Sequence, residues 1–344
     1  MLAHLQLEGS PFEVGQALGR FGAAALQRYA QASPAWATVM RWRGHPRVAA
    51  MAALVRAHHP AIWQELQGLA DGLGLPADEV FLWNCRGDLW AMAPDGCTTV
   101  QLPPAAPGAA PVVAHNEDGD PAFQGHCAIA QVVVRGGARF ASFVYPGSLP
   151  GHTFAATAGG LVVTVNNLRA LEAGTGLPRM VLTRALLDAP GVDAALEGLR
   201  AAPRAGGFHL TLAQAGRPGI VSVEFNDALV SVQAVERPAV HANHMVHAAM
   251  AHRPQIVTGS SGHRQLRGDE LLRQRGAGPV DPLDILFDAE DPRYPIYRDR
   301  ADDSDHENTL ATASFTLGPT QVDWVVRTGG RRETSFRMRD ALRL

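Results

Sequence analysis

The stretch PDGCTTV, residues 94–100, lies at the boundary between two kinds of sequence. Before it, from residue 11 to about residue 90, apolar residues recur at the three- and four-residue spacing of helices. After it, short β-rich pieces bounded by glycine or proline follow one another, which is typical of strands. Cys97 therefore falls where the helical segment ends and the first strand begins.

Beyond this boundary the pattern predicts strands, then two helices, then strands again, in one α+β domain spanning residues 1–344. The proline- and glycine-rich residues 102–111 are expected to be a surface loop that joins the first two strands of one sheet system, rather than a domain boundary. Residues 278–305, rich in Pro, Asp and Arg, are expected to be irregular surface. The expected strands are 111–114, 128–134, 140–145, 153–157, 161–165, 208–213, 220–225 and 229–234, and the expected later helices are 178–187 and 192–199.

The composition excludes several classes of chemistry and partner. All 30 Lys+Arg residues are arginine, which rules out a Schiff-base lysine, a phosphate-loop lysine and a Ser-Lys nucleophile pair. A net charge of −3 gives no basic stripe for nucleic acid and no polybasic patch for an anionic membrane, so we expect small-molecule ligands. No apolar run approaches the ~18 residues that span a bilayer, and no signal segment is visible, so a cytoplasmic location is expected.

The chain has three cysteines with no CxxC spacing, which leaves neither a disulfide framework nor a four-cysteine zinc site and favours a reducing compartment. Cys85 and Cys127 are expected to be buried, inert thiols. Cys97 is the candidate nucleophile, because a thiol at the start of a strand needs only a base and an oxyanion-stabilising group nearby.

Residues after Cys97 supply candidates for those roles. Residues 116–118 (NED) lie just beyond the next strand signal, so a hairpin could bring Asp118 back beside Cys97. Residues 166–167 (NN) end another strand, and residues 241–244 (HANH) end a third stretch. Asparagine amides donate hydrogen bonds without carrying charge, which suits an oxyanion hole, but asparagines at strand ends are also ordinary turn residues.

Eight short motifs, in this order and at this spacing, resemble the family of isopenicillin N acyltransferase, which comprises self-cleaving cysteine hydrolases and acyltransferases. The resemblance runs nearly the full length of the chain. The motifs are EGSPFEVG (8–15), NCR (84–86), DGCTT (95–99), NED (116–118), GLVVTVNNL (160–168), VEF (223–225), HANH (241–244) and HR (263–264).

The resemblance implies the fold of the N-terminal-nucleophile (Ntn) hydrolases, a four-layer αββα sandwich of two antiparallel sheets between helical layers. Family members are made as one inactive chain that cuts itself before its nucleophile, which corresponds here to the bond between Gly96 and Cys97. The expected products are an α chain of residues 1–96 and a β chain of residues 97–344, which remain together as a heterodimer.

The resemblance also implies roles for individual residues. The freed α-amino group of Cys97, with a reference pKa of roughly 7.7 to 8.0, would serve as the base. Asp118 corresponds to the aspartate that orients the new terminus, and Asn243 to the asparagine that stabilises the oxyanion. Asn166 is the expected second polar member, with Asn167 as a one-residue alternative. Thr98, Asn116 and His244 are expected as supporting or substrate-binding groups.

The expected reaction transfers an acyl group from an N-acyl or aminoacyl amide, through a thioester on the enzyme, to water or an amine. No bound cofactor is expected, and a coenzyme A thioester is one candidate acyl donor. Related enzymes carry an arginine just before the strand that corresponds to residues 309–313, where this chain has HEN (306–308). This departure argues against penicillin chemistry specifically. It also supports the alternative of an inactive binding or scaffold protein that kept the fold.

Two patterns raise the question of a metal site. The histidines between residues 241 and 252 include i, i+3 spacings, but no carboxylate or cysteine falls at ligand spacing in that stretch. Residues 116–120 (NEDGD) resemble the start of a calcium loop, yet its sixth and twelfth positions are Pro121 and Cys127 rather than glycine and glutamate. We therefore expect no metal.

Overall fold

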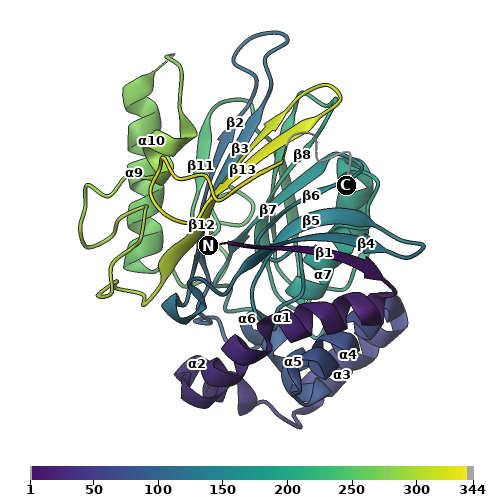
Figure 1. The fold of residues 1–344 in the computed structure, drawn as a ribbon. Coiled ribbons are helices and arrows are strands. Elements are labelled where there is room, and N and C mark those ends of the chain that lie inside the picture. The colour runs from purple at the N-terminus through teal and green to yellow at the C-terminus, as the bar shows by residue number, and fades with distance from the viewer. Residues whose placement is uncertain (1, 277, 339–344) are drawn as a thin grey trace.

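The computed structural model describes residues 2–276 and 278–338 and shows two stacked β-sheets between two layers of helices (Figure 1). Within these residues, the larger sheet contains eight strands. They lie in the order β1 (Ala3–Gly9), β4 (Ala128–Val134), β5 (Arg139–Val144), β6 (Phe154–Thr157), β7 (Leu161–Asn167), β8 (Phe208–Gln214), β9 (Ile220–Phe225) and β10 (Val230–Ala234).

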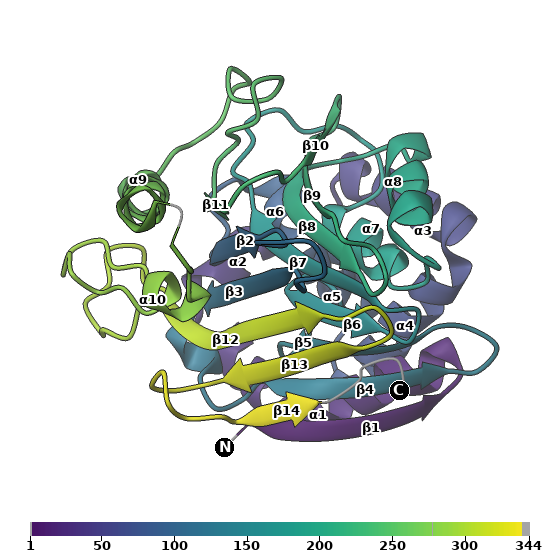
Figure 2. The ribbon, with the colours of Figure 1, turned by 90° about the horizontal axis from the view of Figure 1, so that it is seen from above.

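The smaller sheet carries the strand that begins at the cysteine motif (Figure 2). Its strands, as far as the structure describes the chain, lie in the order β11 (Ala239–His241), β2 (Gly96–Leu102), β3 (Val112–Gly119), β12 (Asn308–Leu317), β13 (Val322–Arg327) and β14 (Phe336–Met338). Because β2 lies inside this sheet, its backbone is held from both sides by β11 and β3.

The N-terminal third forms the helices that the apolar spacing predicted. Helix α1 begins with a capping box in which Ser10 and Glu13 exchange hydrogen bonds. It packs closely on α4, since a Cβ at Gly15 or Gly68 would overlap the facing backbone. The helices are α1 (Pro11–Ala32), α2 (Pro34–Met40), α3 (Pro46–His58), α4 (Pro60–Leu73), α5 (Ala77–Asn84) and α6 (Arg86–Leu89).

The later helices divide between the two outer layers. Helices α7 (Arg179–Leu186) and α8 (Val192–Ala201) lie with the N-terminal helices against the larger sheet. Helices α9 (Gly259–Arg275) and α10 (Pro282–Leu286) cover the smaller sheet, where Leu286 packs with Val100 and Val240. The predicted αββα sandwich is therefore confirmed.

The two sheets meet in an aromatic core in one part of their interface and in a polar region in another part. Phe154 of β6 packs against Phe315 of β12 and Trp324 of β13, with ring centroids 6.2 and 5.9 Å apart. Every residue of β2 and of β7 is buried. The polar side chains on these strands must therefore find partners inside the protein, because an unpaired buried polar group costs free energy.

Two details of the fold bear on the predictions. The loop at 102–111 does join two neighbouring strands, β2 and β3, as expected. Strands β1, β13 and β14 were not predicted. Strand β1 runs parallel to β4, so the larger sheet is not antiparallel throughout. Within the described residues, no helix is long and apolar enough to cross a membrane.

Candidate active site

The β2–β3 hairpin brings the NED motif back against the cysteine motif. The antiparallel register pairs Cys97 with Glu117 and Gly96 with Asp118. The hairpin predicted from the sequence is thus confirmed, and Asp118 lies across from the residue that precedes the cysteine. This register is essential to the site, because a one-residue slip would move every side chain of one strand to the opposite face.

Side chains alternate between the two faces of this hairpin. Thr99 points toward the larger sheet, where its hydroxyl donates to Asn166 Oδ1 at 2.7 Å. Cys97 lies two residues earlier on the same strand and shares this face with Glu117. Thr98 and Asp118 point the other way, toward the layer that contains α9 and the residues before β12.

Cys97 is held by its backbone on both sides and is only 3% exposed. Its N–H donates to Asn243 Oδ1 at 3.0 Å, and its carbonyl oxygen accepts from Arg264 Nη1 at 2.6 Å. Burial raises the pKa of the Cys97 thiol well above its usual range, against the opposing effect of a hydrogen bond from the backbone N–H of Asn167. This shift favours the protonated thiol at neutral pH in the intact chain.

Asn243 is locked in orientation beside this backbone. Its Oδ1 accepts from Cys97 N–H and from Arg264 Nη2, while its Nδ2 donates to the backbone oxygen of Asn167 at 3.1 Å. Its own N–H donates to Ser261 Oγ at 3.0 Å. In the intact chain the amide oxygen faces Cys97, and the amide nitrogen is engaged elsewhere. The role of Asn243 as an oxyanion donor stays a prediction.

The two asparagines at the end of β7 point in different directions. Asn166 turns into the space between the sheets, where its Nδ2 donates to the backbone oxygen of His241 at 3.0 Å. Asn167 faces the cysteine motif: its backbone N–H lies at the thiol, and its Nδ2 donates to the backbone oxygen of Asp95 at 2.8 Å. The structure therefore places Asn167, the one-residue alternative, beside Cys97.

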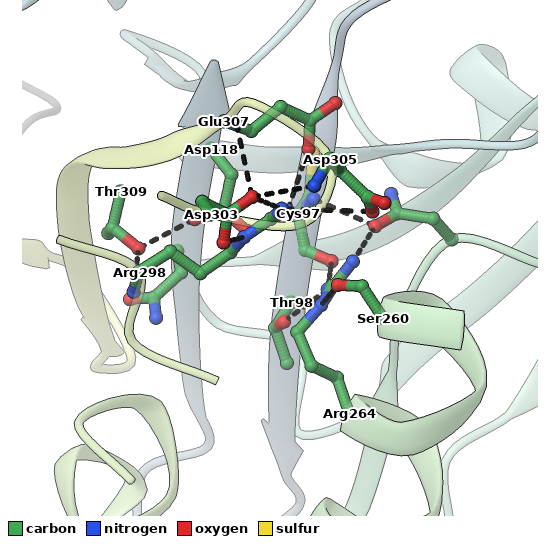
Figure 3. A network of polar contacts seen from close by, with 12 residues as sticks. Cys97, Thr98, Asp118, Ser260, Arg264, Arg298, Asp303, Asp305, Glu307 and Thr309 are labelled. Atoms are coloured by element: carbon green, nitrogen blue, oxygen red, sulfur yellow. Dashed lines mark hydrogen bonds and ion pairs between the residues drawn. The ribbon is translucent and has the colours of Figure 1, made fainter. Parts of the chain in front are cut away.

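Asp118 is fully buried on the face of the hairpin opposite the Cys97 thiol, in a network of polar contacts that includes Thr309 and Arg298 (Figure 3). Its Oδ1 accepts from Thr309 Oγ1 at 2.7 Å, whereas Oδ2 has no hydrogen-bond partner. Burial raises the pKa of Asp118, and the Arg298 guanidinium, 3.9 Å from Oδ2, opposes that rise. The free oxygen leaves Asp118 able to accept one further donor.

A buried arginine, Arg298, lies beside Asp118. It belongs to residues 278–305, which we expected to be irregular surface. Arg298 is buried, and its Nη1 lies 2.7 Å from Glu307 Oε2. It also binds Asp303 through both carboxylate oxygens. Residues 278–305 thus contain the short helix α10 as well as buried side chains, so the prediction of irregular surface was only partly right. The ion pairs with Asp303 and Glu307 hold Arg298 inside the protein.

Ion pairs and hydrogen bonds hold the residues just before Cys97 in place. Asp95 forms a bidentate ion pair with Arg86 at 3.1 and 3.2 Å. Arg169 donates to the backbone oxygens of Ala91 and Ala93. Gly96 has no room for a side chain, because a Cβ there would overlap the carboxylate of Glu307.

The three supporting residues lie around the site without contacting the thiol. Thr98 Oγ1 accepts from Arg264 Nη1 at 2.7 Å. Asn116 donates to the backbone oxygen of Leu286, which ties β3 to α10. The ring of His244 lies 2.8 Å from Ser261 Oγ through Nδ1, and burial lowers the pKa of His244 to about 4.

Beside the thiol lies a compact polar cluster of Glu117, which the sequence gave only as part of the NED motif, with His115 and Tyr145, which it did not single out. Glu117 Oε2 is 3.8 Å from Cys97 Sγ and 3.1 Å from His115 Nε2, while Glu117 Oε1 accepts from the hydroxyl of Tyr145 at 2.6 Å. The ligand atoms of Cys97, His115 and Glu117 lie within 4.8 Å of one another, a spacing that a metal ion can occupy. Each of these atoms already has a hydrogen-bond partner, so we assign no metal ligands here.

Sequence reasoning missed the groups that reach the site from far along the chain. Arg264 appeared only as part of a motif, and Arg298 gave no signal of burial. Glu117 and His115 were detectable in principle, since period-2 alternation from Cys97 places them on its face once the hairpin register is known. Cys85 and Cys127 are buried and unpaired, as expected.

Together, the fold and the site define a class of protein: an αββα sandwich whose inner strand begins at a buried cysteine held by asparagine and arginine side chains. The chain belongs to the acyl-coenzyme A:6-aminopenicillanic acid acyl-transferase family, whose model matches residues 105–330. Among solved structures, it is similar to penicillin V acylase from Agrobacterium tumefaciens. That match has 13% identity and a TM-score of 0.40, and it covers 68% of this chain and 83% of that one. No curated protein sequence matches the chain.

Proposed function

We propose that the protein is a self-cleaving cysteine amidohydrolase or acyltransferase. The chain would cut itself between Gly96 and Cys97, and residues 1–96 and 97–344 would stay together as a heterodimer. The observation that carries this proposal is the placement of Cys97: the thiol, the preceding glycine and a partly unpartnered buried aspartate meet at the start of one strand. Membership of an acyltransferase family supports acyl transfer as the reaction.

The hydrogen bonds of the intact chain suit the cut form as well. The nitrogen that Asn243 Oδ1 now holds would become the free α-amine of Cys97. Asp118 lies across the hairpin from Gly96, so its Oδ2 would accept from that amine and orient it. Arg264 would fix the backbone of Cys97 from the other side, through the carbonyl oxygen.

In turnover, the thiol of Cys97 would attack the carbonyl carbon of an amide or thioester, with the α-amine as base. The backbone N–H and Nδ2 of Asn167 would then stabilise the oxyanion, since Nδ2 would lose its present acceptor if residues 91–95 moved away. The acyl group would pass from the thioester to water or to an amine. A coenzyme A thioester remains the candidate donor for the transfer reaction.

The first experiment is a denaturing gel of the purified protein combined with intact-mass measurement. The wild-type chain should yield pieces of 96 and 248 residues, and Cys97→Ala should remain whole. The matched control is Cys127→Ala, which removes another buried thiol and should leave the cut unchanged. A wild-type chain that stays whole and forms no acyl-enzyme with acyl donors would favour the inactive binding protein instead.

Amide substrates in water and coenzyme A thioesters with and without an amine acceptor separate the two reactions. Consumption of amides in water would indicate a hydrolase. Consumption of the thioester only when the amine is present would indicate an acyltransferase.

A further inference from the structure

The proposed self-cleavage has a chemical requirement that the α-amine cannot meet. Before the cut, the nitrogen of Cys97 belongs to a peptide bond and cannot act as a base. Burial, helped by the charges of Asp118 and Asp95, holds the pKa of the thiol well above its usual range. Another group must therefore take the proton of Sγ while the chain is still intact. The following inference rests on that proposed cleavage.

Glu117 is the candidate base within reach, because the hairpin register places it directly across from Cys97. Its Oε2 lies 3.8 Å from Sγ and 3.1 Å from His115 Nε2. The other oxygen, Oε1, accepts from Tyr145, which follows β5 in the larger sheet. Both Glu117 and His115 are at most 1% exposed. The carboxyl group therefore bridges the thiol and the imidazole without contact with solvent.

The hydrogen bonds around His115 indicate where its protons lie. Asn166 Nδ2 donates to the backbone oxygen of His241, so Asn166 Oδ1 faces Thr99 and accepts its hydroxyl proton at 2.7 Å. Thr99 Oγ1 must then accept from His115 Nδ1, 2.8 Å away. Burial lowers the pKa of His115 to about 3, which leaves the ring neutral and Nε2 without a proton.

The contact between Glu117 Oε2 and His115 Nε2 needs one proton, and on this assignment Glu117 supplies it. Burial raises the pKa of Glu117 well above its usual range, in agreement with a neutral carboxylic acid. The nearby charges of Asp95 and Asp118 act in the same direction, and that of Arg86 opposes them.

We propose that Glu117 and His115 form the proton-transfer pair that activates Cys97 for cleavage of the Gly96–Cys97 bond. Glu117 Oε2 takes the proton of Sγ while Sγ attacks the carbonyl carbon of Gly96, and Glu117 gives its own proton to His115 Nε2. No free thiolate accumulates, since the negative charge passes to the carbonyl oxygen of Gly96 in a tetrahedral intermediate. When this intermediate collapses, the new C–S bond replaces the C–N bond to Cys97.

The proton returns from His115 through Glu117 to the departing nitrogen of Cys97. The products are a thioester at Gly96 and a free α-amine, with no net gain or loss of protons. Water then hydrolyses the thioester to the carboxyl group of Gly96 and the thiol. From that point the α-amine is available as the base, and turnover no longer needs Glu117.

The variant that tests this pair is Glu117→Gln. Glutamine has the same shape and no charge: its oxygen can accept from Tyr145, and its NH₂ can donate to His115 Nε2. It cannot pass a proton on. General acid–base groups typically contribute about 100- to 10,000-fold in rate, so self-cleavage should slow by that factor.

The assay measures formation of the thioester directly, with the full-length chain incubated at neutral pH with hydroxylamine, which traps thioesters. Denaturing gels and intact masses give the rate of the cut after Gly96.

Tyr145→Phe is the matched control, because it removes one hydrogen bond to the carboxyl group of Glu117 but leaves the proton of that group. This variant should slow the cut less than tenfold. Cleavage of Glu117→Gln at the wild-type rate, or an equal slowing of the cut by Tyr145→Phe, would overturn the proposal.

A wild-type chain that hydroxylamine does not cut would refute the proposed self-cleavage itself, and a second measurement then still tests the pair. In the uncut Cys97→Ala protein, the infrared band of a buried protonated carboxyl should disappear when Glu117→Gln is added. Loss of a carboxylate band instead would show that Glu117 is ionised and would refute the proton assignment.

Discussion

Gly96→Ala tests whether the packing at the expected cleavage site is as tight as the structure shows. The added Cβ would overlap Glu307 Oε2 and would lie 3.1 Å from Arg298 Nη1 and 3.2 Å from the Cβ of Asp118. Glu307 has little freedom to retreat, because its 2.7 Å ion pair with Arg298 is buried. The substitution therefore forces either a local expansion or a broken ion pair.

The two responses bracket the expected loss of stability. Overpacking a tight site costs about 1–3 kcal/mol. Breaking a buried ion pair costs about 3–5 kcal/mol. We therefore expect the free energy of unfolding to fall by at least about 1 kcal/mol. With a urea m value of about 3 kcal/mol per M, this loss corresponds to a fall of at least about 0.3 M in the unfolding midpoint.

The assay is urea unfolding of Gly96→Ala in the Cys97→Ala background, so that both chains compared are uncut. The matched control is Gly219→Ala, whose added Cβ meets no atom within 4 Å and should change stability by no more than about 0.5 kcal/mol. In the chain that keeps Cys97, Gly96→Ala should also slow the cut, since the displaced groups surround the scissile carbonyl. Equal stability of Gly96→Ala and the Gly219→Ala control would refute the reasoning about packing.

Two further outcomes test the site and the pH dependence. Asn167→Ala should lower turnover of the cut enzyme by about 100- to 1,000-fold, because it removes an oxyanion donor, whereas Asn166→Ala should mainly lower stability. Steady-state rates per folded molecule compare the two, and equal losses in rate would contradict the assignment to Asn167. Stability should also fall as the pH drops from 7 to 5, because burial lowers the pKa of His152 to about 4 against about 6.5 in the unfolded chain. Unfolding then takes up a proton in this window, which is worth about 2 kcal/mol for one histidine. His152→Asn, whose amide can replace Nδ1 as donor to the backbone oxygen of Leu149, should reduce that loss in urea unfolding; an unchanged pH dependence would show that His152 is not the cause.

The local parts of the fold were predictable because neighbouring residues in the sequence decide them. Apolar spacing gave the helices before residue 90, and β-rich pieces between glycines and prolines gave most of the strands. The β2–β3 hairpin was also accessible, since the NED motif follows Cys97 by one strand and a loop. Strand β1 was missed because its pairing partner, β4, lies more than 100 residues further along the chain.

The candidate site likewise has a part that the sequence predicted and a part that it did not. The sequence by itself determined that Cys97 starts a buried strand, that Gly96 precedes it and that Asp118 returns beside it, because one hairpin connects all three. Only the tertiary structure decided which asparagine of residues 166–167 faces the thiol. It also brought in Arg264 and Arg298, each more than 160 residues from Cys97. The physical reason is that these groups are buried through ion pairs and hydrogen bonds made across the fold, and such long-range pairing leaves no mark in the local pattern of the sequence.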